Sequence, residues 1–226
     1  MDVLVTGADG DLGRAVAEGF RAAGHRVVVT GLAPEQLELV AGELGVEAVL
    51  CDPADPASLA ASQPRFPQHL DAVITVPGRS WPGADPSNST VPDTALSWRS
   101  AFDRTVLSAV LTVQAVGDQL RSGGAIVAVA PAPDRGPEAA AKAALSDWTA
   151  GQAAHFGTRG ITVNTIAYGR LAQPGYDGLT AAAPSGPAEI ARLAVFLATP
   201  AARHITGQTL HVGRSTGIVA GSIGRG

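Results

Sequence analysis

Short apolar runs rich in valine, isoleucine and threonine recur along the chain, separated by longer stretches that are rich in alanine and leucine. Runs of this length and composition are typical of β-strands. Their nearly continuous apolar character is typical of strands covered on both faces. The pattern predicts strands at 2–6, 25–30, 46–51, 71–76, 125–130, 161–167 and 208–212.

The longer stretches between these runs have helical patterns, which predict helices near 11–23, 34–44, 93–121, 138–157 and 187–198. Seven strands separated by helices indicate βαβ crossovers. We therefore expect an α/β fold with a doubly wound parallel sheet of about seven strands and helices on both faces. No linker, repeat or low-complexity tract divides the chain, which predicts a single domain over residues 1–226.

Two segments follow neither pattern. Residues 77–92 are dense in Pro, Gly and Ser, and residues 169–187 are similar. Both come directly after predicted strands, so we expect them at the carboxyl edge of the sheet, where ligands bind in folds of this class.

Composition and charge narrow the classes of function. Of the 226 residues, 46% are apolar and 16% charged, which suits one large core and argues against a disordered chain. The net charge is −4 and the 16 Lys and Arg form no run, so neither nucleic acid nor a membrane surface is expected as a partner. Five histidines without metal-ligand spacing and a single Cys51 indicate neither a metal site nor a disulfide framework. No apolar stretch is long enough for a membrane span, and we expect a soluble cytoplasmic protein.

The segment TGADGDLG, residues 6–13, comes directly after the first predicted strand and opens the first predicted helix. In this context Gly7 suits a tight turn, Gly10 a close approach of backbone to a pyrophosphate, and Gly13 close packing of helix on strand. The helix N-terminus supplies free N–H groups and a positive dipole end for phosphates. The sequence therefore predicts a dinucleotide site.

The choice between NAD and NADP is less determined. The second strand ends in Thr30-Gly31-Leu32-Ala33, with neither an acid to bind a ribose hydroxyl nor an arginine to bind a 2′-phosphate. Asp9 and Asp11 lie inside the glycine loop and would repel an extra phosphate, which favours NAD over NADP. The alternative is that they have a capping role, with Asp11 as the N-cap of the first helix.

These features resemble the short-chain dehydrogenase/reductase family over nearly the whole chain, which implies a Rossmann-type fold. Besides the glycine loop, CDPADPASL (51–59) is similar to the family segment whose aspartate, here Asp52, contacts adenine. RGITVNTIAYG (159–169) and ITGQTLHV (205–212) are similar to the segment after the catalytic helix and to the closing strand. The resemblance implies binding of NAD or NADP, and the cofactor-binding candidates are Gly7, Asp9, Gly10, Asp11, Leu12, Gly13, Asp52, Pro77, Gly78, Lys142 and Gly169.

The chain departs from the family at the catalytic positions. The family's Tyr-x-x-x-Lys helix corresponds to EAAAKAAL, residues 138–145, so Lys142 matches the lysine and Glu138 replaces the tyrosine. Pro131 stands after the fifth strand where a serine is usual, and Thr105 stands where a helical asparagine is usual. A carboxylic acid with a pKa of about 4.3 is protonated in only about one molecule in 500 at pH 7, which makes a glutamate a poor proton donor. Alternatively, Glu138 and Lys142 form an ordinary helix-surface ion pair.

Tyr168 and Tyr176 are the two tyrosines of the chain. Tyr168 follows the sixth strand, close to where the nicotinamide carboxamide should lie, and Tyr176 falls in the loop that covers substrate in the family. Either side chain could donate a proton in place of the missing tyrosine, or could line a pocket as an aromatic. The catalytic candidates are therefore Lys142, Glu138 and Tyr168.

Two functions remain open at this point. The first is an NAD(P)-dependent oxidoreductase that acts on a small carbonyl or alcohol with a non-standard proton donor. The second is a non-catalytic dinucleotide-binding sensor or partner subunit. We also expect a homodimer or homotetramer, with the stripe of Ile190, Leu193, Ala194 and Leu197 serving either core packing or a subunit interface.

Overall fold

The computed structural model describes residues 1–78, 89–131, 136–169 and 186–213. Most of the two segments predicted as loops, 77–92 and 169–187, lies outside these ranges, as do Tyr176 and residues 214–226. None of the described helices is long and apolar enough to cross a membrane.

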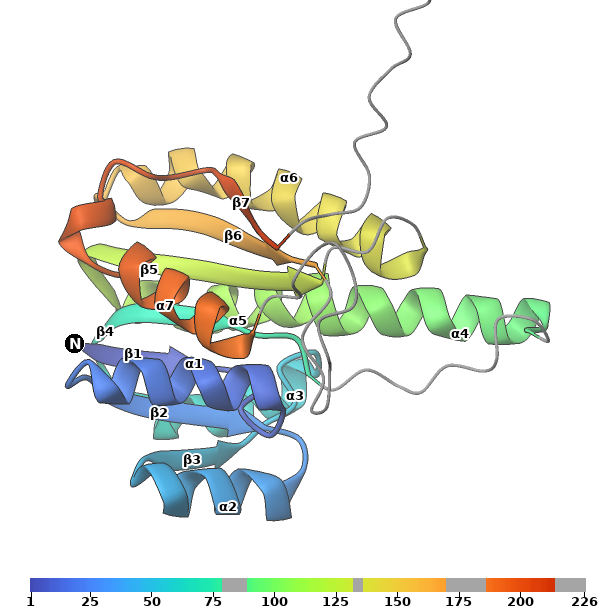
Figure 1. The fold of residues 1–226 in the computed structure, drawn as a ribbon, viewed down its shortest axis with the longest axis horizontal. Helices are drawn as coiled ribbons and strands as arrows, with labels where there is room; N and C mark the ends of the chain where they lie inside the picture. The colour runs from blue at the N-terminus through green and yellow to red at the C-terminus, as the bar shows by residue number, and fades with distance from the viewer. Residues whose placement is uncertain (79–88, 132–135, 170–185, 214–226) are drawn as a thin grey trace, which may run out of the picture.

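The core of the fold is one seven-stranded sheet in the order β3-β2-β1-β4-β5-β6-β7, in which every neighbouring pair is parallel (Figure 1). This confirms the predicted doubly wound parallel sheet. The strands are β1 (Asp2–Val5), β2 (Arg26–Gly31), β3 (Glu47–Leu50), β4 (Leu70–Thr75), β5 (Leu120–Pro131), β6 (Thr162–Tyr168) and β7 (Thr209–Val212).

Helices cover both faces of this sheet, which explains why the strands are apolar at successive positions. One apolar cluster joins the sheet to α1 (Asp11–Ala22), α2 (Pro34–Leu44) and α7 (Pro187–Leu197). Two further clusters join the other face to α3 (Pro56–Ser62), α5 (Ser108–Val116) and α6 (Pro137–Gly157).

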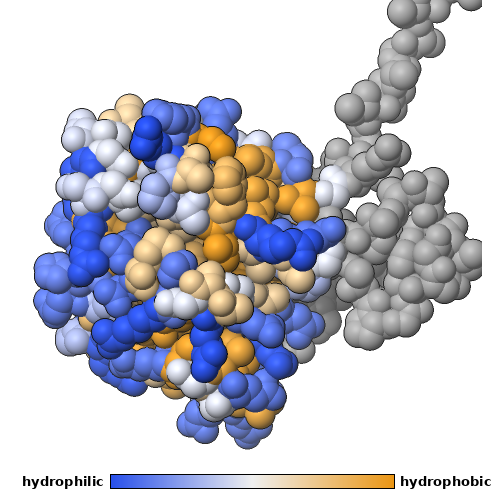
Figure 2. All heavy atoms as spheres, turned by 60° about the vertical axis from the view of Figure 1, so that its left-hand side comes forward, coloured by the Kyte–Doolittle hydropathy of each residue, from blue (hydrophilic) through white to orange (hydrophobic). Residues whose placement is uncertain are grey.

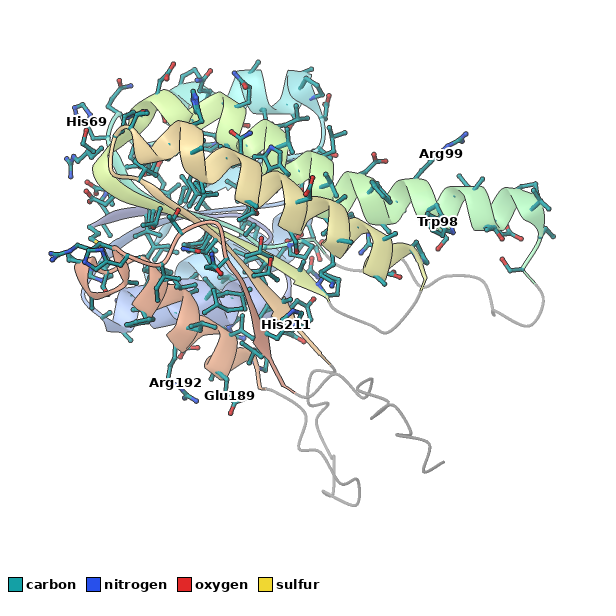
Figure 3. The ribbon with its side chains drawn as sticks, turned by 90° about the horizontal axis from the view of Figure 1, so that it is seen from above. His69, Trp98, Arg99, Glu189, Arg192 and His211 are labelled. Atoms are coloured by element: carbon teal, nitrogen blue, oxygen red, sulfur yellow. The ribbon has the colours of Figure 1, made fainter. Side chains whose placement is uncertain are left out.

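The helix predicted over 93–121 is divided in the structure. It begins as α4 (Val91–Phe102), continues through a π-helical segment η2 (Asp103–Leu107) and ends as α5. Part of α4 extends beyond the rest of the fold, with Trp98 and Arg99 on this free part (Figure 3). A π-helical turn is rare and occurs often at functional sites, which makes η2 a segment of interest.

Helix α3 is absent from the sequence prediction. Its seven residues are too few to show a 3.6-residue period, and its start depends on a cap: Asp55 accepts hydrogen bonds from the backbone N–H groups of Ala57 and Ser58. The sequence feature that indicates this helix is therefore the aspartate before Pro56, and not an apolar pattern.

The apolar stripe of α7 serves the core. Ile190, Ala194 and Leu197 are fully or almost fully buried, and α7 packs on α1, where Ala191 approaches Gly19 closely. Exposed large apolar side chains lie on α4, at Val91, Leu96 and Trp98, and on the outer side of α7, at Phe196. The expected homo-oligomer stays a prediction.

At the amino-terminal edge of the sheet, polar contacts join the strands β1, β4 and β5. Asp71, at the start of β4, accepts a hydrogen bond from the Asp2 backbone N–H at 2.7 Å and pairs with Arg121 at 3.0 Å. Burial raises the pKa of the Asp71 carboxyl, but these two partners outweigh burial and hold the pKa below its ordinary value. Figure 2, which brings this side of the molecule forward, shows hydrophilic side chains with apolar patches between them.

The packing around Gly13 yields a first prediction. A Cβ at this position would lie 2.1 Å from the carbonyl oxygen of Gly7, so Gly13→Ala must displace backbone and should lower the free energy of unfolding by roughly 1–3 kcal/mol. Gly10 has φ −107° and ψ 158°, a conformation that alanine adopts readily, so Gly10→Ala should cost less than about 1 kcal/mol. Urea unfolding of the two variants measures the difference, and equal midpoints would contradict this packing.

Candidate active site

A hollow at the carboxyl edge of the sheet brings together segments that are far apart in the sequence. It is lined from the turn after β1, the ends of β2 and β3, the loop after β4, and the η2–α5 helix. The lining residues are Gly7, Asp9, Gly31, Leu32, Asp52, Pro53, Ala54, Gly78, Arg104 and Ser108. Four of the predicted cofactor residues, Gly7, Asp9, Asp52 and Gly78, meet here.

The turn after β1 depends on two of its glycines. Gly7 has φ +65°, and a Cβ there would lie 2.5 Å from the carbonyl oxygen of Val76. Gly13 packs against the Gly7 carbonyl, so its role is contact with the turn itself rather than with the strand. Helix α1 therefore begins directly against the turn, as a phosphate-binding helix must.

The predicted capping role of Asp11 is wrong. The N-cap of α1 is Gly10, and no side chain caps this helix. Asp11 is the first helical residue, and its side chain is exposed. An acid at this position interacts favourably with the helix dipole, which explains its presence without a capping hydrogen bond.

Asp9 reaches across to the segment after β2. Its Oδ2 atom accepts hydrogen bonds from the backbone N–H groups of Leu32 at 2.9 Å and Ala33 at 3.0 Å. A Cβ on Gly31 would lie 2.7 Å from the Asp9 Cγ atom, so the glycine leaves room for this carboxylate. The other oxygen, Oδ1, is buried at the hollow without a hydrogen-bond partner among the described residues. Asp9 therefore brings a carboxylate from the glycine loop to the end of β2, where the sequence itself has no acid.

The segment after β3 is held by local hydrogen bonds. The Asp52 backbone N–H donates to Ser58 Oγ at 2.8 Å, and Asp52 Oδ1 accepts from the Ala54 N–H at 2.9 Å. On the other side of the hollow, Pro77 and Gly78 are half-buried after β4. Leu12 is almost fully buried in the apolar core, so its side chain does not reach the hollow.

Glu138 lies in the first turn of α6 and pairs with an unexpected cation. Its Oε1 atom is 3.9 Å from Nη2 of Arg104 on η2. No ion pair forms between Glu138 and Lys142 within the described part of the chain, so the helix-surface pair expected as an alternative is not observed. Lys142 is half-buried one helical turn further along α6.

Tyr168 is the last residue of β6, where it stands beside Pro131 of β5 and Val212 of β7. Burial raises the pKa of its phenol to about 12. The positive charge of Arg104 lowers this pKa and the negative charge of Glu138 raises it. These three side chains therefore form one electrostatic group at the carboxyl edge. Gly169 follows, and its backbone N–H donates to the Val212 carbonyl at 3.1 Å.

The comparison with known proteins agrees with this geometry. A family model described as enoyl-(acyl carrier protein) reductase matches residues 7–214. A protein of Mycobacterium tuberculosis, named only as an oxidoreductase, is 60% identical over 214 residues, which cover 94% of this chain and 96% of the relative.

The chain belongs to the short-chain dehydrogenase/reductase family.

More distant members of the short-chain dehydrogenase/reductase family match over similar lengths. The 3-oxoacyl-[acyl-carrier-protein] reductase of Escherichia coli is 28% identical, over 92% of this chain and 94% of the relative. A solved short-chain dehydrogenase from Burkholderia cenocepacia, in complex with NADP, has a TM-score of 0.79 at 26% identity, covering 93% of this chain and 95% of that one.

Two residues of this short-chain dehydrogenase/reductase were missed by sequence reasoning, namely Arg104 and Ser108. Arg104 directly precedes Thr105, the position of the usual helical asparagine, and Thr105 itself is buried. The position of Arg104 next to this family motif was the one feature of the sequence that could have identified it. The π-helical geometry that places Arg104 beside Glu138 has no sequence pattern of its own.

The environment of Tyr168 yields a second prediction. Its phenol should ionise near pH 12, against about 10 for an ordinary tyrosine. Because the raised pKa belongs to the folded state, ionisation of Tyr168 should destabilise the fold as the pH rises from 10 towards 12. The difference between ultraviolet phenolate titrations of the wild type and Tyr168→Phe isolates this group. If the difference curve had its midpoint near pH 10, the value of an ordinary tyrosine, the burial of the phenol would be contradicted.

Proposed function

We propose that this short-chain dehydrogenase/reductase is an NAD-dependent oxidoreductase that acts on a small carbonyl or alcohol, with Tyr168 as its proton donor. The observation that carries the proposal is the position of Tyr168. It is a neutral phenol at the carboxyl edge of the sheet, in one electrostatic group with Arg104 and Glu138. The family resemblance and the 60% identical relative named as an oxidoreductase support the reaction class.

The residues around the hollow fit a dinucleotide. The uncapped start of α1 offers N–H groups to a pyrophosphate, and the close packing of Gly7 and Gly13 leaves the turn free of side chains there. Asp9 lines the hollow, and we infer that its carboxylate accepts a hydrogen bond from a ribose hydroxyl when the nucleotide is bound. Asp52 would lie beside the adenine and Lys142 beside the nicotinamide ribose, as in the family. When bound, the dinucleotide supplies or accepts a hydride.

Asp9 favours NAD over NADP. A carboxylate at the ribose position accepts hydrogen bonds from the hydroxyls of NAD but repels the 2′-phosphate of NADP. The related Burkholderia structure contains NADP, so the preference inferred here rests on this chain's own Asp9.

Tyr168 suits the donor role better than Glu138 because a carboxylic acid is rarely protonated at neutral pH, whereas a phenol keeps its proton. In carbonyl reduction, the substrate carbon receives a hydride and its oxygen receives the proton of Tyr168 Oη, which gives an alcohol. The positive charge of Arg104 acts on the Tyr168 phenol and would partly offset the negative charge that develops on the phenolate oxygen.

The second candidate function is a dinucleotide-binding protein without hydride transfer. Pro131 and Glu138, which replace the usual serine and tyrosine, favour it. Nucleotide binding without turnover on any carbonyl or alcohol would support this candidate.

Asp9 yields a third prediction. Wild type should show a larger thermal shift with NAD and NADH than with NADP and NADPH; a ligand at 100 times its dissociation constant stabilises a fold by about 2.7 kcal/mol. Asp9→Asn keeps an acceptor for Leu32 and Ala33 but places a donor at the Oδ1 position. This variant should therefore bind NAD less tightly and NADP more tightly.

Asp11→Asn is the matched control because it removes the same charge from the same loop at an exposed position. It should leave the preference for NAD unchanged. An equal change in both variants would mean that the charge of the loop, rather than the contact of Asp9, sets the preference.

Tyr168 yields a fourth prediction. If NADH oxidation is measured with a panel of small aldehydes and ketones, Tyr168→Phe should lower the turnover by roughly 10²- to 10⁴-fold, the usual contribution of a general acid. Binding of NADH should change little, because the phenyl ring keeps the packing. A turnover equal to that of the wild type would exclude Tyr168 as the donor.

A further inference from the structure

Arg104 is held in the cleft in a defined orientation. Its Nε atom donates to both the carbonyl oxygen and the hydroxyl of Ser100, each at 3.2 Å. The side chain is 22% exposed and lines the hollow beside Ser108 and Gly78. Because the stem and Nε are fixed by α4 and η2, the guanidinium points its two terminal nitrogens in a fixed direction.

Those terminal nitrogens are incompletely used within the described part of the chain. The recorded polar contact is the Glu138 carboxylate at 3.9 Å, which is an ion pair but too long for a hydrogen bond. The end of the guanidinium formed by Nη1 and Nη2 is a fork that matches a carboxylate or phosphate. Arg104 therefore has the capacity for a bidentate partner that Glu138 does not fill at this distance.

Other charged groups lie around Arg104. Helix α6 packs on η2, and it carries Glu138, which pairs with Arg104, and Lys142 one turn further along. Asp9 and Asp52 line the same hollow as Arg104. Glu138 is the carboxylate that an anionic ligand of Arg104 would have to displace.

We propose that Arg104 determines the substrate class by binding a carboxylate or phosphate group of the substrate, so that the enzyme acts on anionic carbonyl or alcohol compounds. This inference rests on the proposed function. The Arg104 guanidinium pairs with Glu138, and its charge acts on Tyr168, the proposed proton donor. Arg104 also lines the same hollow as Gly7 and Asp9, so the experiment has to distinguish binding of the substrate from binding of the cofactor.

The experiment compares matched anionic and neutral probes: acetoacetate with its methyl ester, and dihydroxyacetone phosphate with dihydroxyacetone. The full-length protein is titrated with each probe in the presence of NAD⁺, which cannot reduce a carbonyl, and binding is followed by calorimetry. Where NADH supports turnover, the same pairs are compared by kcat/KM. The anionic member of at least one pair should bind about tenfold to hundredfold more tightly, as expected for a charged hydrogen-bonded pair.

Arg104→Met keeps the length of the stem and should abolish this preference, with affinity for the neutral probes and for NAD⁺ unchanged. Arg104→Lys keeps the charge but loses the fork and should retain part of the preference. Arg99→Met, on the exposed part of α4 (Figure 3), removes an equal charge and should have no effect. Glu138→Gln removes the competing carboxylate and should strengthen binding of the anionic probes.

Two results would overturn the inference. The first is equal affinity for both members of each pair with NAD⁺ bound. The second is a loss of NAD⁺ affinity in Arg104→Met as large as the loss for the anionic probe, which would make Arg104 a ligand of the cofactor phosphates. Failure of the wild type to bind any nicotinamide nucleotide is a different result, because it refutes the proposed function itself.

Discussion

The site depends on a pair of hydrogen bonds between Thr6 and Val76. The Val76 backbone N–H donates to Thr6 Oγ1 at 3.0 Å, and the hydroxyl donates back to the Val76 carbonyl at 3.2 Å. These bonds join the ends of β1 and β4, the two strands at which the order of the sheet reverses. In such a sheet the connections from these strands run to opposite faces, so a crevice opens between them. This contact explains why residue 7 is a glycine, because a Cβ at that position would lie 2.5 Å from the Val76 carbonyl oxygen.

The crevice carries charges of both signs. Asp9, from the turn after β1, bonds the segment after β2, Asp52 follows β3, and Arg104 on η2 lines the same hollow and pairs with Glu138. Carboxylates suit the hydroxyl and amino groups of an adenosine, and a cation suits an anion. The proposed preference for NAD and the proposed anionic substrate therefore rest on different residues of one hollow.

The fold could be predicted from the sequence because parallel strands covered on both faces leave a strong apolar signal. Small shifts at most strand ends, and one of five residues at the start of β5, do not hide this signal. Failures occurred where structure depends on single contacts. Asp11 stands at a position typical of a helix cap, but it does not cap α1. Asp9 bonds the segment after β2, and this contact joins residues 23 positions apart. Glu138 and Lys142 have ideal helical spacing, yet the partner of Glu138 comes from η2. Helical periodicity records which residues share a face and contains no information about the neighbouring helix.

Glu138, which stands where the family has a tyrosine, is paired with Arg104 of η2. A tyrosine at position 138 would leave the Arg104 guanidinium without its carboxylate partner, and Pro131 would still lack the hydroxyl that the family uses beside it. The position of Tyr168 next to Pro131 in the register of β5 and β6 places the phenol at the same edge, on a strand instead of a helix. Arg104, Glu138 and Tyr168 act on one another electrostatically, so a change in any one alters the charge around the other two. The three positions thus form one unit, whose chemistry is set by this chain's own residues.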